Sequence, residues 1–318
     1  MKKLLARCIL ILTLISSIAA GAAQLNVCSF NIQFLGNGTM RDDKALAEAI
    51  KSFDIVVVQE LVAPPYPGQF PDGTAFRPKP KSAKFFDAMK QRGFTYWLSE
   101  EDTGKTTNIH NNSSATEWFV AFYKTNALKV ATDLPHGFLH PVHGHNPDFD
   151  RVPYAFSFRT QDAKMDFVLI SVHLRPDSSG KAWRKHELAT IGTWVQTHSQ
   201  KEKDFIILGD MNIENAAELL ADLPPGFRSL NDGCVPTNTN VNGPRPYDHV
   251  MFLPAHTGRE IDSTFGFKVL NLIAAMKPLW HSSLPYPGNP YSHDKFRAWY
   301  SDHHPVYFRM ISPATDDD

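Results

Sequence analysis

The sequence is poor in cysteine and carries almost no net charge. It has three cysteines among 318 residues and contains neither a Cys-x-x-Cys nor a His-Glu-x-x-His motif, so a zinc site is not indicated. No serine or cysteine with a matched base stands out, so water is the expected nucleophile. The formal net charge is −1, so any nucleic-acid site must be a local basic patch.

Long apolar runs are absent after the first 23 residues. That segment has a basic start, an apolar run over 10–18 and small residues over 19–23. Its apolar part is too short for a good membrane span, and no cysteine follows the small residues in a lipid-attachment context. We therefore predict a bacterial-type signal peptide over 1–23, a mature domain over 24–318, and a secreted or periplasmic protein without a stable membrane anchor.

Two cysteines remain once this segment is removed, Cys28 and Cys234. An oxidising compartment permits a disulfide between them. The alternative, which we favour, is that Cys28 is a small apolar residue in a core strand, because a sequence does not show whether two Cα atoms approach one another.

Apolar patterning predicts one mixed α/β domain, because most expected strands are joined by hairpins or helices and no repeat or interdomain linker interrupts them. The central stretch is 204–214, where four apolar residues in a row predict a buried strand and Gly209 is expected to let the backbone turn. Further strands are expected at 25–32, 55–58, 95–98, 118–123, 154–159, 167–173, 247–253 and 306–311, and helices at 41–53, 84–92, 183–198 and 216–223.

Four histidines lie between residues 134 and 153, among proline, glycine and aspartate. Their spacing matches no tight metal-ligand pattern. We interpret this segment as a polar loop.

Polar residues of the same kind lie at six ends of the expected strands. They are Asn31, Glu60, His173, Asp210 with Asn212, Asp248, and Asp302 with His303. Each alone is explained as a loop cap, but in open α/β sheets the loops at one end of the strands build the site, and six such residues are unlikely to coincide by chance.

These residue types suit metal-assisted attack on a phosphate ester. Glu60 and Asp302 are hard oxygen donors of the kind that Mg²⁺ prefers. His173 and His303 can donate protons near neutral pH, and a carboxylate partner would fix the tautomer of each ring. The carboxylates available for that role are Asp248 and Glu117.

The ordered segments resemble the motif set of the endonuclease/exonuclease/phosphatase superfamily, which has the deoxyribonuclease-I-like fold. The matching segments are SFNIQ at 29–33, VQE at 58–60, SVH at 171–173, GDMN at 209–212, YDHV at 247–250 and SDHHPV at 301–306. The resemblance spans nearly the whole mature chain. It implies an α/β fold, a four-layer α/β/β/α sandwich of two packed mixed sheets flanked by helices.

The resemblance also implies a metal-binding half of the site. Glu60 is similar to the main Mg²⁺ ligand, with Asn31 and Asp302 close to the ion. Asp210 resembles the residue that orients or deprotonates the attacking water, and Asn212 resembles an amide that contacts the phosphate. Mn²⁺ and Ca²⁺ are the alternative ions.

Two histidines complete the implied site. His303 resembles the catalytic histidine that is held by Asp248. His173 resembles the second histidine, and Glu117 the carboxylate that supports it in the secreted deoxyribonucleases. The following residue, His304, falls on a variable position of the motif and receives no role.

The family covers nucleases, sphingomyelin phosphodiesterases and phosphatases, so the fold alone leaves the substrate open. We favour a secreted Mg²⁺-dependent endonuclease acting on DNA, with RNA as a further candidate and the protein acting as a monomer. Arg175, together with Arg184 and Lys185, is a candidate phosphate contact, although a solvated helix face explains the last two equally well.

One departure and one alternative bear on the substrate. The secreted deoxyribonucleases have an arginine just after the metal-binding glutamate, whereas this chain has leucine, valine and alanine at 61–63. A lipid phosphodiesterase would expose an aromatic hairpin, for which the aromatic-rich stretch 279–300 is the candidate, although such residues more often simply pack. A non-catalytic binding module is the third hypothesis, and the complete set of site residues argues against it.

Overall fold

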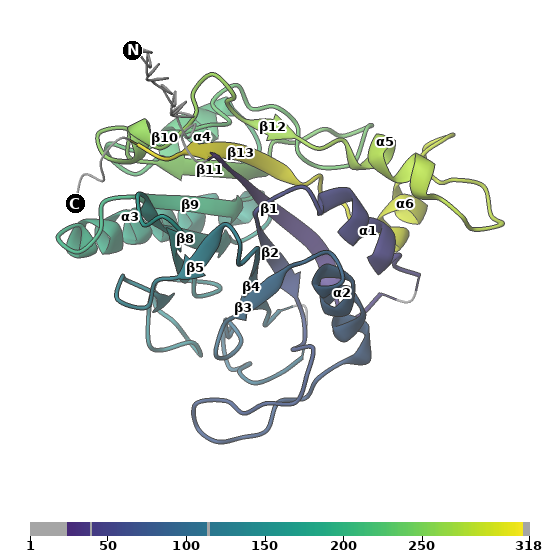
Figure 1. Ribbon diagram of the computed structural model, residues 1–318, viewed down its shortest axis with the longest axis horizontal. Helices are drawn as coiled ribbons and strands as arrows, with labels where there is room; N and C mark the ends of the chain where they lie inside the picture. The colour runs from purple at the N-terminus through teal and green to yellow at the C-terminus, as the bar shows by residue number, and fades with distance from the viewer. Residues whose placement is uncertain (1–23, 39, 113–114, 314–318) are drawn as a thin grey trace, which may run out of the picture.

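Two β-sheets pack face to face in the computed structural model, and helices cover the outer face of each sheet (Figure 1). The model describes residues 24–38, 40–112 and 115–313, so the predicted signal peptide over 1–23 lies outside the described residues. The predicted four-layer α/β/β/α sandwich is confirmed. Within the described part of the chain, no helix combines the length and the apolar character needed to cross a bilayer.

The first sheet has six strands in the order β12-β13-β1-β2-β4-β3. The strands are β1 (Gln24–Leu35), β2 (Ile55–Leu61), β3 (Thr95–Leu98), β4 (Trp118–Tyr123), β12 (Lys268–Val269) and β13 (Val306–Ile311). Strands β1 and β2 are parallel, and the other pairs are antiparallel. The helices packed on this sheet are α1 (Asp43–Ile50), α2 (Pro80–Lys90), α5 (Leu272–Met276) and α6 (His293–Trp299).

The second sheet runs in the order β10-β11-β9-β8-β7-β5, with β6 also paired to β7. Its strands are β5 (Leu128–Val130), β6 (Gly137–Phe138), β7 (Tyr154–Thr160), β8 (Asp166–His173), β9 (Phe205–Asp210), β10 (Arg228–Ser229) and β11 (Asp248–Phe252). Here β8 and β9 form the parallel pair. Helices α3 (Lys181–His198) and α4 (Ala216–Asp222) cover its outer face.

Three apolar cores hold the four layers together. The first lies between the β1–β4 sheet and its helices, and it contains Phe30 and Phe86. The second lies between the two sheets, where Val57 packs with residues such as Phe156 and Leu208. The third lies between the β7–β9 sheet and α3 and α4. Because the central strands are mostly apolar on both faces, the charged side chains of the site lie at their ends.

Most predicted elements are confirmed, with changes at their ends. Strands β3, β4 and β13 have the predicted bounds, but α2 begins at Pro80, four residues earlier than predicted. Proline lacks only an amide that the first turn of a helix leaves unpaired anyway, so it starts this helix. The stretch 254–300, for which no helix or strand was predicted, contains α5 and α6.

Gly209 has a different role from the predicted turn. It lies inside β9 with φ of +143°, and a Cβ built on it would stand 2.0 Å from the carbonyl oxygen of Val172. The glycine therefore allows β9 to approach β8 closely, just before the strand delivers Asp210. Any side chain at this position would push the two central strands of the second sheet apart.

The two cysteines among the described residues are both free. Cys28 is fully buried in the first core, as we favoured, and Cys234 is partly exposed. In the histidine-rich segment, His143 is buried and its Nδ1 lies 2.8 Å from the carbonyl oxygen of Asp102. Among the described residues, this segment contributes to no cluster with metal-ligand distances.

Candidate active site

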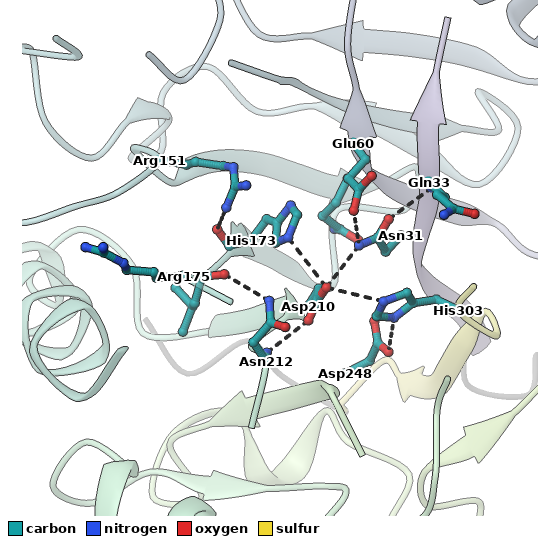
Figure 2. Close-up of polar contacts among 12 residues, drawn as sticks. Asn31, Gln33, Glu60, Arg151, His173, Arg175, Asp210, Asn212, Asp248 and His303 are labelled. Atoms are coloured by element: carbon teal, nitrogen blue, oxygen red, sulfur yellow. Dashed lines mark hydrogen bonds and ion pairs between the residues drawn. The ribbon is translucent and has the colours of Figure 1, made fainter. Parts of the chain in front are cut away.

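The ends of strands from both sheets open into one cleft of about 370 Å³ (Figure 2). The lining includes Glu60, His173, Asp210, Asn212, Asp302 and His303. Strands β1 and β2 enter from the first sheet, and β8 and β9 from the second. The predicted convergence of distant segments is therefore what the structure shows.

Glu60 is turned toward the cleft by a local irregularity in β2. The pairing of β2 with β4 shifts register between Val58 and Leu61, and Glu60 has φ of +62°. Such bulges redirect a side chain at the cost of backbone strain, and they cluster at functional sites. Burial raises the pKa of the Glu60 carboxyl, and Asn31 offsets part of this shift by donating a hydrogen bond of 2.9 Å to its Oε1.

Asn31 joins the two sheets at the cleft. Its Nδ2 donates to Glu60 at 2.9 Å and to Oδ2 of Asp210 at 3.0 Å. Its own Oδ1 accepts from the backbone amide of Gln33 at 3.0 Å, which fixes the orientation of the carboxamide. One amide group therefore sets the distance between two carboxylates that come from different sheets.

Asp210 stands between two imidazoles (Figure 2). Its Oδ2 lies 3.4 Å from Nε2 of His303 and 3.6 Å from Nε2 of His173. Its Oδ1 accepts from the backbone amide of Asn212 at 2.9 Å. A carboxylate held in this way can orient a water molecule placed among the three side chains.

Each imidazole is backed by a buried carboxylate. Nδ1 of His173 lies 2.7 Å from Oε1 of Glu117, and Nδ1 of His303 lies 2.8 Å from Oδ2 of Asp248. Both predicted pairs are therefore present. The carboxylates fix the tautomer so that Nε2 of each ring faces the cleft.

The electrostatics of the two rings favour the protonated forms. Burial acts to lower the pKa of His303, but Asp248 and Asp210 outweigh it and raise that pKa well above its usual value. For His173, burial and the positive charge of Arg151 lower the pKa, while Glu117 and Asp210 raise it, and the net shift is upward. Both rings are therefore suited to donate protons near neutral pH.

Of the other predicted site residues, one lines the cleft and one points away from its centre. Asn212 lines the cleft and donates from Nδ2 to the carbonyl oxygen of Leu174 at 3.0 Å. It has φ of +52°, so a turn after the strand, and not strand alternation, brings it beside Asp210. Arg175 is exposed and its guanidinium points away from Asp210, at the rim of the site (Figure 2).

The donors present fit a divalent cation. Glu60, His173 and Asp210 each offer a ligand atom within 4.8 Å of the others. Asp302 lines the same cleft, and its Oδ1 is buried without a hydrogen-bond partner among the described residues. A buried carboxylate oxygen without a partner is costly, and a cation would satisfy it.

Sequence reasoning missed Arg151. This buried residue lines the cleft, its Nε lies 2.8 Å from Oε1 of Glu117, and its Nη1 donates to the carbonyl oxygen of His173 at 3.3 Å. Together with His173 it lowers the pKa of Glu117, although burial alone would raise it. Arg151 lies in the loop that was interpreted only as polar, and no local pattern identifies it.

Arg184 was a candidate phosphate contact, and this prediction is wrong. Its side chain is completely buried, and it forms an ion pair with Glu218 and donates to the carbonyl oxygens of Arg175 and Asp177. It anchors the loop before α3 and is not accessible to a ligand. Lys185, on the same helix, is exposed but does not line the cleft.

Two features bear on the substrate. The residues that replace the expected arginine at 61–63 are completely buried, so this segment makes no contact with a ligand. The aromatic residues of 279–300 do not form an exposed hairpin, because they pack against one another and against the first core. They are Trp280, Tyr286, Tyr291, Trp299 and Tyr300.

The fold and the cleft define a class that sequence comparison also identifies. The model of the Endonuclease/Exonuclease/phosphatase family matches residues 28–303, so the chain belongs to this family. The solved structure of an endonuclease/exonuclease/phosphatase family protein from Bacteroides thetaiotaomicron has the same fold. That comparison gives a TM-score of 0.55 at 16% identity and covers 92% of this chain and 96% of the other.

Two curated relatives are deoxyribonucleases. The chain is 27% identical to human deoxyribonuclease gamma over 208 residues, and this alignment covers 64% of this chain and 60% of the relative. It is 25% identical over 198 residues to the deoxyribonuclease gamma of Rattus norvegicus, covering 60% of this chain and 56% of the relative. The alignment thus spans less than two thirds of the length of either relative.

Proposed function

We propose that this protein is a divalent-metal-dependent phosphodiesterase that hydrolyses DNA, with Mg²⁺ as the physiological ion. The observation that carries the proposal is the position of Asp210 between two carboxylate-backed imidazoles, His173 and His303. This arrangement supplies an acceptor for a proton from water and two donors for phosphate oxygens within one cleft. The arrangement does not suit acyl transfer through a covalent intermediate, because that chemistry requires a protein nucleophile.

The residues that would hold the cation are Glu60 and Asp302, with Asn31 beside them, whereas Asp210 and His173, which also lie near Glu60, would serve in proton transfer. A bound divalent cation polarises the phosphoryl oxygens and offsets negative charge that develops in the transition state. Asn31 keeps Glu60 at a fixed distance from Asp210, so the cation and the attacking water would be held in register.

The chain's own groups account for the proton transfers. Asp210 orients the attacking water and accepts its proton. His303 and His173, whose pKa values are raised, donate hydrogen bonds to the phosphate or a proton to the leaving oxygen. Asn212 and Arg151 line the same cleft and contribute a neutral and a positive donor to a phosphate.

DNA is the favoured substrate because the curated relatives are deoxyribonucleases and because the His173–Glu117 pair resembles theirs. RNA is the second nucleic-acid candidate. We propose that the protein acts as a secreted or periplasmic monomer, after removal of residues 1–23.

The test is the degradation of supercoiled plasmid by the purified mature protein. We expect nicked and linear products with Mg²⁺, none with EDTA, and about a 10³-fold slower reaction for Glu60→Gln. Turnover of sphingomyelin vesicles without cleavage of DNA or RNA would contradict the proposal and favour the lipid phosphodiesterase. A phosphatase would release inorganic phosphate from monoesters in the same panel.

A further inference from the structure

A second hollow lies beside the cleft, and Phe34 forms the wall between the two. This hollow, which we call the Phe34 pocket, has a volume of about 300 Å³, and its lining includes Gln33, Phe34, Asn37, Arg41 and Arg297. Phe34 lines the cleft as well. Only the ring of Phe34 would therefore separate a ligand bound at the scissile position from the Phe34 pocket.

Phe34 is held in an unusual backbone conformation. Gln33 and Phe34 have φ of +55° and +51°, a region that residues with side chains rarely adopt. The amide of Phe34 donates to Oε2 of Glu60 at 3.0 Å, so the backbone is fixed to the carboxylate at the centre of the site. The ring nevertheless remains 37% exposed. An exposed aromatic ring on a strained and anchored backbone is typical of a functional position.

Gln33 contains a buried polar atom that has no hydrogen-bond partner in the described part of the chain. Its side chain is 6% exposed, and Oε1 is buried without a hydrogen-bond partner among the described residues. Gln33 lines the Phe34 pocket and lies on the far side of Asn31 from Asp210 (Figure 2). Buried acceptors without partners are rare, and a ligand N–H would satisfy this one.

The charges of the Phe34 pocket leave one arginine for a ligand. Arg41 is committed, because it donates to the carbonyl oxygens of Ile32 and Gln33. Arg297 has a side chain that is 38% exposed, and its Nη2 lies 3.7 Å from Oδ2 of Asp302. That contact is long for a hydrogen bond, so Arg297 can contact an anion beside the cleft. The lining carboxylate, Asp294, is exposed.

We infer that the Phe34 pocket is a subsite for one unpaired nucleotide next to the scissile phosphate, with the base stacked on Phe34, an N–H of the base donated to Gln33, and the neighbouring phosphate on Arg297. The inference rests on the proposed function and specifies which form of nucleic acid the site takes. Single strands and frayed duplex ends fit it, because a base inside a duplex is already stacked and paired.

The dimensions and chemistry support this occupant. A volume of about 300 Å³ is at the lower end for ligand pockets, so it suits a single nucleotide and not a larger group. Stacking of a base on an aromatic ring is the usual device of proteins that bind single strands. The buried segment at 61–63 provides no groove contact, so one anchor on duplex DNA is absent from this place.

The first test measures binding without chemistry. A fluorescein-labelled single-stranded oligonucleotide is titrated with the whole mature protein in EDTA, alongside the same strand in a duplex and the same strand lacking all its bases. We expect the intact single strand to bind most tightly. Equal affinity for the intact and the base-free strands would overturn the inference.

The matched variants are Phe34→Ala, Phe34→Trp and Leu284→Ala. Loss of the ring raises the Kd for the single strand about tenfold and leaves the Kd for the base-free strand unchanged, because only stacking is removed. Tryptophan restores binding. Leu284 is 57% exposed and lies outside the Phe34 pocket and the cleft, so its truncation controls for general loss of apolar surface. An unchanged Kd in Phe34→Ala would overturn the inference.

Cleavage of the intact and the base-free strands separates this inference from the proposed function. The base-free strand lacks any ring that could stack on Phe34, so its cleavage with Mg²⁺ reports on the chemistry alone. If Phe34→Ala slows cleavage of the base-free strand as much as cleavage of the intact single strand, Phe34 has a structural role and the subsite is refuted. If the unaltered protein, folded and supplied with Mg²⁺, cleaves neither substrate, the proposed function itself fails.

Discussion

The two histidine–carboxylate pairs of the cleft have similar geometry and different surroundings. His173 with Glu117 and His303 with Asp248 have contacts of 2.7 Å and 2.8 Å. The Glu117 pair also has Arg151, which binds the carboxylate and lowers the pKa of His173. The Asp248 pair has no such cation among its main influences, and the pKa of His303 is raised further. Similar geometry therefore yields one strongly and one moderately basic imidazole.

The largest effect is expected for the group that both pairs share. Asp210→Asn removes the acceptor between the two imidazoles and lowers kcat/KM on single-stranded DNA by about 10⁴-fold. Circular dichroism would check that the fold is retained. Residual activity within tenfold of the unaltered protein would show that Asp210 takes no part in the chemistry.

The next effect distinguishes the two pairs. His303→Gln lowers kcat/KM by about 10³-fold and His173→Gln by about 10²-fold, because the ring with the higher pKa holds its proton more firmly at neutral pH. His281→Gln is the control, since that ring is exposed and does not line the cleft. Equal losses, or a larger loss for His173, would contradict the ranking.

Replacement of Arg151 should make the pKa values of the two histidines more alike. Arg151→Gln leaves Glu117 buried with one partner fewer, so the free energy of unfolding falls by about 3 kcal/mol. The pKa of His173 rises, because a neighbouring positive charge is lost, and NMR titration of the histidine ring would measure the shift. An unchanged pKa would show that Arg151 does not cause the difference between the pairs.

The matched control is Arg228→Gln. Arg228 pairs with Asp232 at the surface, where an ion pair contributes about 1 kcal/mol or less. Urea denaturation of both variants would compare the two losses. Similar losses would mean that burial of the Glu117 carboxylate adds no cost.

The pKa of a third histidine, His304, is shifted in the opposite direction, and its replacement is expected to have the smallest effect. Burial and the neighbouring His303 lower the pKa of His304 to about 4, and its Nδ1 accepts from the amide of Leu272 at 2.9 Å. The unfolded ring takes up a proton near pH 6.5, so stability is present above that value and is lost as the pH falls toward 4. The loss is about 2 kcal/mol.

The variant His304→Asn keeps an acceptor for Leu272 and does not titrate. We expect its free energy of unfolding, measured in urea at several pH values, to fall less between pH 6.5 and pH 4 than that of the unaltered protein. An identical pH profile would exclude His304 as a source of acid sensitivity.

The sequence predicts the elements that bury their own apolar residues and misses those that depend on distant partners. Strands such as β4 are continuous apolar runs, so local pattern suffices. Strands of two or three residues, such as β10 and β12, exist only because a longer neighbour pairs with them. The short helices α5 and α6 lie among prolines and aromatic residues that hide a helical period.

The site shows the same division. Residues at the ends of apolar strands, such as Asp210, could be predicted because strand and polar residue are adjacent in the sequence. Arg151 could not, since its partner Glu117 lies just before β4, distant in the sequence, and its own segment has no period. Arg184 is of the residue type that contacts phosphates. Only its complete burial shows that its guanidinium binds groups of the protein instead.

The bridging of the sheets by Asn31 has a consequence for dissection of the molecule. Glu60 and Glu117 belong to the first half of the chain, while His173, Asp210, Asp248 and His303 belong to the second half. A fragment that stops after β4 would contain Glu60 and Glu117 without the histidines. The remainder would contain both histidines, but His173 would lack its carboxylate partner Glu117. Neither piece could work by itself, because β12 and β13 from the second half complete the first sheet, and recovery of turnover on mixing the pieces would report reassembly of the fold.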